Sequence, residues 1–316
     1  MPSTEVGRFA PTPSGRLHLG NLFCSLLAWL SAKSQNGRVL LRIEDLDTQR
    51  TSEHYTRQLQ RDLHFLGLDW DEGGDLGGPN GPYWQSQRSS YYQQCLDTLS
   101  SMELTYPCFC SRAQLHAAQA PHLEDGQVLY PGTCRDLTPQ QIAQRTQQRL
   151  PAVRLQVPDR TISFTDGHYG KVHQHLPTQC GDFILRRSDG VFAYQLAVAA
   201  DDGAMGVTEV VRGRDLLSST PRQLWLLKLL GFPAPRYAHT PLLLAPDGRR
   251  LSKRDGDVSL SALQKKGYTA ADIIGRLAWL AGLQPRPQPV LPAQLAKDFS
   301  WDKVPHEDIL LPPDLF

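Results

Sequence analysis

Two short segments far apart in the chain carry residue types that handle phosphate groups. Residues 15–21 (Gly-Arg-Leu-His-Leu-Gly-Asn) follow a short apolar stretch and open an apolar run that continues to Trp29. A strand, a turn and a helix N-terminus form a phosphate site, because the first helical turn has unpaired N–H groups and a positive dipole end. His18 can reach a phosphoryl oxygen, and Gly20 lets the backbone approach a nucleotide. The segment predicts a nucleotide site; the simpler alternative is a histidine that only caps the helix.

The second segment is Arg-Leu-Ser-Lys-Arg at residues 250–254. Lys253 lies among arginines as a cation suited to a polyphosphate, and Ser252 adds a hydroxyl donor. The segment follows Asp-Gly at residues 247–248, a good turn dipeptide, so a solvated basic turn is the alternative. The two segments together, in this order and about 230 residues apart, are more specific than either alone.

Three charged residues come at the ends of predicted strands. Arg8 and Arg212 end strands predicted at residues 6–10 and 207–212, and Glu44 follows one predicted at 38–43. Open α/β sheets bind ligands at the carboxyl ends of their strands, which predicts that these three side chains share one site. The alternative for each residue taken singly is a surface ion pair.

Three cysteines have spacing that suits a metal. Cys108 and Cys110 are two residues apart, and Cys134 follows 24 residues later. Three thiolates close most of a tetrahedral zinc shell, and general rules favour His116 or His122 as the fourth ligand. The expected zinc is structural, and three buried free cysteines are the alternative. The other cysteines are predicted to be core residues: Cys24, Cys95 and Cys180.

Composition sets the broad class of the protein. A chain of 316 residues with 40% apolar residues can bury a large core, in one or two domains. It has no apolar run long enough for a membrane span and no signal-peptide pattern, which predicts a cytoplasmic protein. The net charge of +1 gives no general argument for nucleic acid, so RNA affinity would come from local basic patches.

The predicted elements form an α/β protein. A strand at 6–10, a helix at 19–34 and a strand at 38–43 make a right-handed βαβ unit, the building block of a parallel sheet. Helices are also predicted at 51–66, 89–104 and 221–230, with Thr51 or Ser52 as the first N-cap. Residues 71–81 read as a loop, and 106–187 read as an irregular insertion with short strands at 152–156 and 183–186. The proline-rich stretch at 284–292 is predicted to be a stiff surface segment.

These blocks resemble the catalytic core of the glutamate branch of the class I aminoacyl-tRNA synthetases. Residues 15–21 and 250–254 are similar to its two signature sequences, HIGH and KMSKS, and four further blocks match at residues 8–15, 41–47, 193–197 and 211–215. The resemblance implies a Rossmann-like, doubly wound parallel sheet and formation of glutamyl-adenylate from L-glutamate and ATP with Mg²⁺. It divides the chain into a first catalytic half (1–105), a zinc-containing insertion that resembles an acceptor-binding region (106–187), a second catalytic half (188–245), and the KMSKS-like loop with a small helical C-terminal region (246–316).

The resemblance also implies roles for residues. Arg8, Tyr194 and Arg212 would hold the substrate carboxylates, and Glu44 would take the ammonium group. The loop after the first strand would complete the glutamate site with Phe9, Ala10, Pro11 and Thr12. The catalytic and ATP-binding residues would be His18, Gly20, Asn21, Ser252 and Lys253. Tyr130 would be the fourth zinc ligand. Thr12 stands where the family often has Ser, and Val198 where full glutamyl enzymes usually have Asn.

The acceptor is expected from the length of the chain. Only 62 residues follow Arg254, whereas full glutamyl-tRNA synthetases continue into a helical anticodon-binding region, so no such domain is expected. A core of this shorter form resembles family members that activate glutamate without RNA and attach it to queuosine in the anticodon loop of tRNA(Asp). A monomer is expected. The alternatives are a shortened glutamyl-tRNA synthetase that charges a tRNA 3′ end, and a non-catalytic paralogue that binds nucleotide or RNA.

Overall fold

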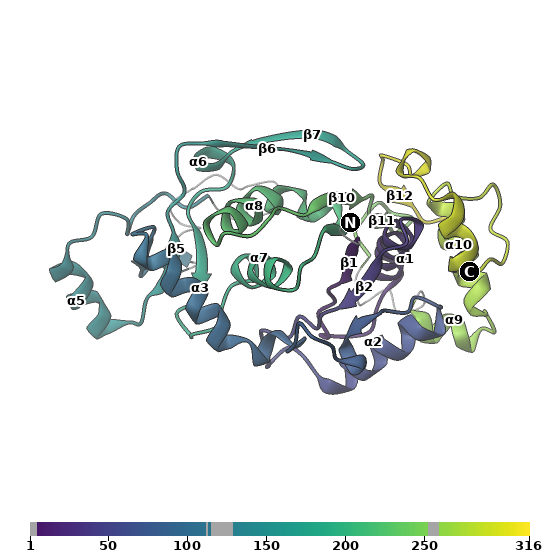
Figure 1. Cartoon of the computed structure of the whole chain (residues 1–316), viewed down its shortest axis with the longest axis horizontal. Helices are drawn as coiled ribbons and strands as arrows, with labels where there is room; N and C mark the ends of the chain where they lie inside the picture. The colour runs from purple at the N-terminus through teal and green to yellow at the C-terminus, as the bar shows by residue number, and fades with distance from the viewer. Residues whose placement is uncertain (1–4, 112, 115–128, 252–258) are drawn as a thin grey trace.

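The computed structural model describes residues 5–111, 113–114, 129–251 and 259–316. The molecule is elongated, with a parallel sheet near its centre (Figure 1). A small antiparallel sheet and helix α5 (Pro139–Gln148) lie at one end, and the C-terminal helices α9 (Leu260–Lys265) and α10 (Ala270–Leu280) lie at the other. No helix within the described ranges is long and apolar enough to cross a membrane.

The first catalytic half begins with the predicted βαβ unit. Strands β1 (Val6–Phe9) and β2 (Arg38–Leu41) pair in parallel, and helix α1 (Leu19–Ser34) connects them. Helix α1 has the predicted bounds because apolar residues recur along it at helical spacing, and ten of its sixteen residues are buried. Helices α2 (Glu53–Phe65) and α3 (Ser89–Ser101) also form where predicted, and the N-cap of α2 is Ser52.

The second catalytic half extends the sheet. Its elements are α7 (Tyr194–Ala204), β9 (Glu209–Gly213), a 3₁₀ segment (Arg214–Ser219), α8 (Thr220–Leu229) and β10 (Arg236–Thr240). Strand β10 pairs in parallel with β9, and β9 lies beside β1, where the N–H of Thr208 donates to the Val6 carbonyl at 2.9 Å. The carboxyl ends of β1, β2 and β9 therefore lie at the same edge, as the sequence predicted.

The segment at 106–187 is divided between two sheets. Strands β4 (Thr105–Cys108), β5 (Ala152–Leu155) and β8 (Phe183–Arg186) form the antiparallel sheet at the end of the molecule. The hairpin β6 (Thr161–Asp166) and β7 (Gly170–His175) instead runs back along the molecule, and β6 pairs with β10 at Asp166 and Tyr237 (Figure 1). Helix α6 (Leu176–Gln179) then leads to β8. The hairpin thus belongs to the same sheet as β9 and β10, while the domain boundaries stay predictions.

The loop predicted at 71–81 was partly wrong. It contains a two-residue strand, β3 (Glu72–Gly73), parallel to β2, and a 3₁₀ turn (Gly74–Leu76). A second 3₁₀ turn follows at Gln85–Gln87. Gly73 has φ 87°, and a Cβ there would lie 2.1 Å from the Leu41 carbonyl oxygen. Only glycine allows this close approach between backbones, which is why a glycine-rich stretch can still add a strand here.

The C-terminal part packs on the first catalytic half. Helix α10 buries Ile273, Ile274 and Leu277 in the same core cluster as α1. Helix α11 (Pro292–Leu295) and 3₁₀ turns at Ala296–Asp298 and Trp301–Lys303 follow the proline-rich stretch. Strand β12 (Ile309–Leu310) pairs with β11 (Leu243–Leu244), which joins the end of the described chain to the catalytic half.

Candidate active site

A cavity of about 700 Å³ opens at the carboxyl ends of β1, β2 and β9. It brings together most of the residues predicted from the sequence: Arg8, Phe9, Ala10, Pro11, Thr12, His18, Asn21, Glu44, Tyr194 and Arg212. Two residues that the sequence analysis singled out and the structure describes, Gly20 and Val198, do not line this cavity. Val198 is fully buried within α7.

His18 is both a helix cap and a cavity residue. Its Nδ1 accepts from the Asn21 N–H at 3.4 Å, and its own N–H donates to the Asn21 side-chain oxygen at 3.1 Å. A Cβ on residue 20 would lie 3.1 Å from His18 Cε1, so Gly20 leaves room for the imidazole. A helix cap and a nucleotide-site residue are therefore compatible roles for His18: the capping box fixes the ring at the N-terminus of α1, beside the cavity.

Ser252 and Lys253 lie outside the described residues, but the chain on both sides of their segment is placed. Ser259, the first described residue after it, forms a backbone bridge with His18. Arg16 Nη1 donates to Ser261 Oγ at 2.9 Å. On the other side, Arg250 Nη1 lies 3.5 Å from Asp215 Oδ2. The fold therefore brings the flank that follows the second basic segment to the first signature, and the flank that precedes it to Asp215.

Arg212 is a buried cation with neutral partners. Its Nε donates to His239 Nε2 at 3.1 Å, and its Nη1 donates to Gln223 Oε1 at 2.7 Å. Its Nη2 donates to Thr220 Oγ1 at 2.8 Å and to the Leu216 carbonyl at 3.2 Å. The side chain is only 4% exposed, and it forms no ion pair with a carboxylate in the described part of the chain. A guanidinium has five N–H donors, so one Nη1–H remains for a ligand.

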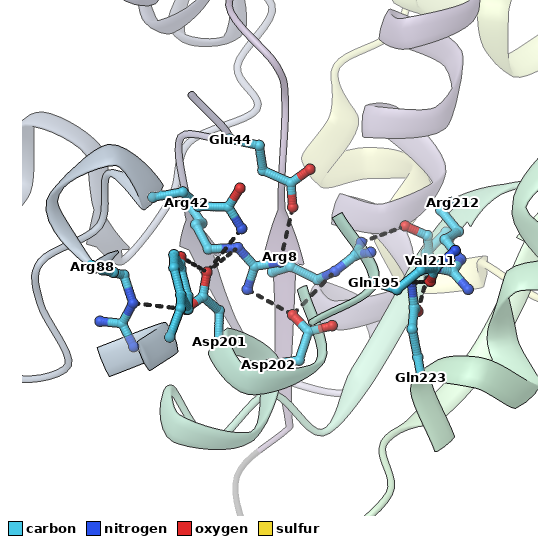
Figure 2. Close-up of polar contacts among 12 residues, drawn as sticks. Arg8, Arg42, Glu44, Arg88, Gln195, Asp201, Asp202, Val211, Arg212 and Gln223 are labelled. Carbon is cyan, nitrogen blue, oxygen red and sulfur yellow. Dashed lines mark hydrogen bonds and ion pairs between the residues drawn. The ribbon is translucent and has the colours of Figure 1, made fainter. Parts of the chain in front are cut away.

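Arg8 and Glu44 are held through a shared network beneath the cavity. Arg8 Nη1 donates to the Val211 carbonyl at 2.7 Å, and its Nε lies 3.9 Å from Asp202 Oδ1. Arg42, which is fully buried, donates to the same Asp202 oxygen at 2.7 Å and to Glu44 Oε1 at 3.1 Å (Figure 2). Burial raises the pKa of the Glu44 carboxyl, although the charge of Arg42 acts against this. The Arg42 guanidinium thus connects Glu44 with Asp202, the carboxylate beside Arg8, and so supports both predicted substrate-binding residues.

The network continues to Asp201. This carboxylate accepts from Arg88 Nε at 2.7 Å, from Gln85 Nε2 at 2.8 Å and from the Tyr92 hydroxyl at 2.8 Å. Three guanidinium groups and three carboxylates therefore balance one another in the ion-paired network of this region: Arg8, Arg42 and Arg88 with Glu44, Asp201 and Asp202. Arg212 stands outside these pairs and its direct partners are neutral, because the Asp166 carboxylate lies behind His239, so a ligand carboxylate can pair with Arg212 directly.

Tyr194 begins α7 and lines the same cavity, half-buried. Burial raises the pKa of its phenol, so the hydroxyl stays neutral and can donate a hydrogen bond to a carboxylate.

Sequence reasoning missed the residues that support the site. Arg42 and Asp202 could have been found from the sequence, because each charged residue adjoins an apolar run, and a charge buried with that run must have a partner. His239 had no such signal, since one histidine in a short strand has no pattern. Asp166 lay in a segment that was read as an insertion.

The three predicted cysteines lie together at the end of the molecule, away from the cavity residues. Their sulfur atoms all lie within 4.8 Å of one another, and Cys110 Sγ is 3.6 Å from Cys134 Sγ. The Tyr130 hydroxyl oxygen lies 3.5 Å from Cys108 Sγ and 3.7 Å from Cys110 Sγ. Ligands of one tetrahedral zinc, at Zn–S of about 2.3 Å and Zn–O of about 2.0 Å, would be roughly 3.5–3.8 Å apart. The donor set therefore fits zinc, and the alternatives His116 and His122 lie outside the described residues.

Comparisons with known proteins agree with this geometry. The family model for "tRNA synthetases class I (E and Q), catalytic domain" matches residues 5–289. The glutamyl-Q tRNA(Asp) synthetase of Symbiobacterium thermophilum is 50% identical over 98% of this chain and 96% of its own length. The enzyme of the same name from Nitratidesulfovibrio vulgaris is 49% identical with the same coverage of both chains.

A solved structure shares the fold. The glutamate tRNA ligase of Elizabethkingia meningosepticum, in complex with its amino acid, superposes with a TM-score of 0.84 at 28% identity, over 99% of this chain and 68% of that one. This confirms the predicted Rossmann-like α/β fold of a class I synthetase. By the family model and the near full-length relatives, the chain belongs to the class I tRNA synthetases of the glutamate and glutamine group and, within them, to the glutamyl-Q tRNA(Asp) synthetases.

Proposed function

We propose that this ligase activates L-glutamate with ATP to glutamyl-adenylate, without needing RNA, and transfers the glutamyl group to queuosine in the anticodon loop of tRNA(Asp). The observation that carries the first step is the charge of the cavity. The ion pairs beneath it balance, and Arg212 is a buried cation whose direct partners are all neutral, with one donor left for a ligand. Glutamate offers a carboxylate to each of Arg8 and Arg212, whereas glutamine offers only one carboxylate and an amide, so glutamate matches the site.

The substrate contacts follow from this charge pattern. Arg212 binds one carboxylate of glutamate, and Arg8 with Tyr194 binds the other, because guanidinium and phenol groups donate to carboxylate oxygens. Glu44 accepts from the ammonium group. The backbone and side chains after β1, residues 9–12, form the adjoining wall of the cavity. Glutamine is rejected because an amide leaves the buried Arg212 charge uncompensated.

The nucleotide binds at the N-terminus of α1. The N-terminus of this helix, together with His18 and Asn21, binds the phosphates of ATP, which enters with Mg²⁺, and Gly20 contributes by leaving room for the imidazole. Lys253 and Ser252 of the other signature are assigned to the same phosphates, and Ser259, which follows their segment, forms a backbone bridge with His18. The glutamate carboxylate attacks the α-phosphorus and pyrophosphate leaves. These residues position the two reactants and neutralise the charge that develops on the phosphoryl oxygens.

The RNA step is supported by the relatives named glutamyl-Q tRNA(Asp) synthetase, which match over nearly their whole length at 49–50% identity. Unstacked bases of an anticodon loop are the accessible part of a tRNA, so the modified base can enter an open cavity. The alternative acceptor is a tRNA 3′ end.

One experiment separates the two acceptors. The protein is incubated with ATP, labelled glutamate and tRNA(Asp) from cells that make queuosine or from cells that cannot, and the labelled nucleotide is mapped by nuclease digestion. We expect label in the anticodon loop of the modified tRNA only. Comparable labelling of both tRNAs would refute the proposal. Label that persists without queuosine and disappears after periodate oxidation of the 3′ ribose would support 3′-end charging.

We further propose that Cys108, Cys110, Cys134 and Tyr130 bind one structural zinc. Two hydrogen-bond donors would stabilise the negative charge of thiolate ligands. Arg154 Nε lies 3.2 Å from Cys108 Sγ, and the Phe109 N–H donates to Cys134 Sγ at 3.4 Å. The metal would join the loop after β4 to the segment before α5, and would stabilise this region without entering the reaction.

Replacing Cys110 with serine is expected to release the metal and lower the melting temperature, because ligand assembly and folding are coupled. Zinc content by elemental analysis and thermal unfolding measure the two effects. Cys95→Ser is the control for zinc content, since Cys95 is a cysteine in a different core cluster, away from the proposed metal ligands. Wild-type protein that contains no zinc would contradict the proposal.

A further inference from the structure

A buried chain of hydrogen bonds leads away from Arg212 through its Nε, whereas its open donor is on Nη1. Arg212 Nε donates to His239 Nε2, and His239 Nδ1 lies 2.6 Å from Asp166 Oδ2. His239 and Arg212 are neighbours on β10 and β9, while Asp166 ends β6 and is 73 residues from His239 in the sequence. All three side chains are at most 4% exposed. The hairpin β6–β7 therefore contributes a residue that lies behind the proposed glutamate site.

The direction of each hydrogen bond in this chain is fixed by chemistry. An arginine Nε can only donate, so His239 Nε2 must be an unprotonated acceptor, and the ring proton must be on Nδ1. That proton is donated to Asp166. Burial lowers the pKa of His239 to about 4, and the charge of Arg212 acts in the same direction, so the ring stays neutral at neutral pH. The carboxylate therefore sets the tautomer, and the tautomer sets the acceptor that Arg212 meets.

The orientation of the Asp166 carboxylate is fixed as well. Its Oδ1 accepts three backbone N–H groups, from Tyr169 at 2.9 Å, His168 at 3.0 Å and His239 at 3.2 Å. Oδ2 is thereby left to face the imidazole. Burial alone would raise the pKa of Asp166, but the hydrogen bonds from His239, Tyr169 and His168 outweigh it and the pKa is lowered. Asp166 is thus an anion whose Oδ1 is held by backbone N–H groups and whose Oδ2 accepts the hydrogen bond donated by His239.

We infer that Asp166 and His239 are positioning residues that orient the guanidinium of Arg212 for its substrate carboxylate. The inference rests on the proposed role of Arg212 in glutamate binding. Because the imidazole is neutral, it holds Arg212 without cancelling its charge. A carboxylate in direct contact with Arg212 would instead compete with the substrate. Asp166 fixes the tautomer of His239 and does not contact Arg212 itself.

Asp166→Asn is the sharpest test, because the three backbone N–H groups keep an oxygen at the Oδ1 position. The amide N–H₂ then faces His239 Nδ1, the ring proton moves to Nε2, and two donors oppose each other at Arg212. We expect the KM for glutamate in ATP–pyrophosphate exchange to rise about 10- to 100-fold, the range for loss of a hydrogen bond to a charged group. The KM for ATP should not change.

Two further variants make the test specific. In His239→Gln, the amide can offer its oxygen to Arg212 and its N–H₂ to Asp166, so the KM for glutamate should rise less than in Asp166→Asn. Glu209→Gln is the matched control, because Glu209 is a buried carboxylate at the opposite end of the same strand as Arg212. It should leave both KM values at the wild-type level.

NMR of ¹⁵N-histidine-labelled protein reads the tautomer directly, and His239→Gln assigns the signal. We expect the Nδ1–H form in the wild type and the Nε2–H form in Asp166→Asn. A wild-type KM for glutamate in Asp166→Asn, or a raised KM with the Nδ1–H form retained, would overturn the inference. Failure of the proposed function would look different: the wild-type protein would not support glutamate-dependent exchange, while the tautomer would still report on the chain from Asp166 to Arg212.

Discussion

Replacing Arg212 with methionine is expected to lower kcat/KM for glutamate activation by about 2–5 kcal/mol of transition-state stabilisation, the cost of removing one partner of a buried charge pair. The effect should be mainly on the KM for glutamate, because the lost contact is to a substrate carboxylate in the ground state as well. The preference for glutamate over glutamine should shrink in the same variant. ATP–pyrophosphate exchange with each amino acid measures both effects.

The control for this variant is Arg236→Met. Arg236 begins the neighbouring strand β10, at the end of the sheet away from the cavity, and it pairs with Glu5 and Glu209. Its replacement should leave the kinetics of glutamate activation unchanged. If Arg212→Met kept the wild-type discrimination between glutamate and glutamine, the charge argument for the substrate would be wrong.

Lys253→Ala is expected to slow adenylate formation by about 2–4 kcal/mol, the size of effect seen when one preorganised donor to a developing charge is removed. Lys253 is assigned to the phosphates of ATP, so the loss should appear in the single-turnover rate of adenylate formation. Glutamate affinity should change little, because the amino acid is held by residues of β1, β9 and α7.

Lys265→Ala provides the comparison for Lys253→Ala. Lys265 is an exposed lysine at the end of α9, close in sequence to the basic segment. Its replacement removes one positive charge, as Lys253→Ala does, but at a different position. It should have no effect on the single-turnover rate. A loss of glutamate affinity in Lys253→Ala that equals the loss of rate would show that its role is misassigned.

Local patterns were enough to predict the elements that carry the cavity. Apolar residues at helical spacing predicted α1, and the short apolar stretches at residues 6–10 and 38–43 predicted β1 and β2. Once the βαβ unit is recognised, parallel pairing brings the carboxyl ends of its strands to one edge, and the cavity there follows. The cysteine spacing likewise predicted the cluster of Cys108, Cys110 and Cys134, because ligands two residues apart on one chain are already close, whereas Tyr130 was implied only by the family resemblance.

The partners of the buried charges were decided by the tertiary structure alone. Arg42 meets Asp202 across 160 residues of sequence, and His239 meets Asp166 across 73. The second contact exists because the β6–β7 hairpin, inside a segment that looks irregular, returns to pair with β10. The sequence by itself determined which side chains stand at the strand ends, because periodicity records which face of an element is buried. It could not determine which distant carboxylate compensates a buried cation, because that depends on where the fold places the other elements.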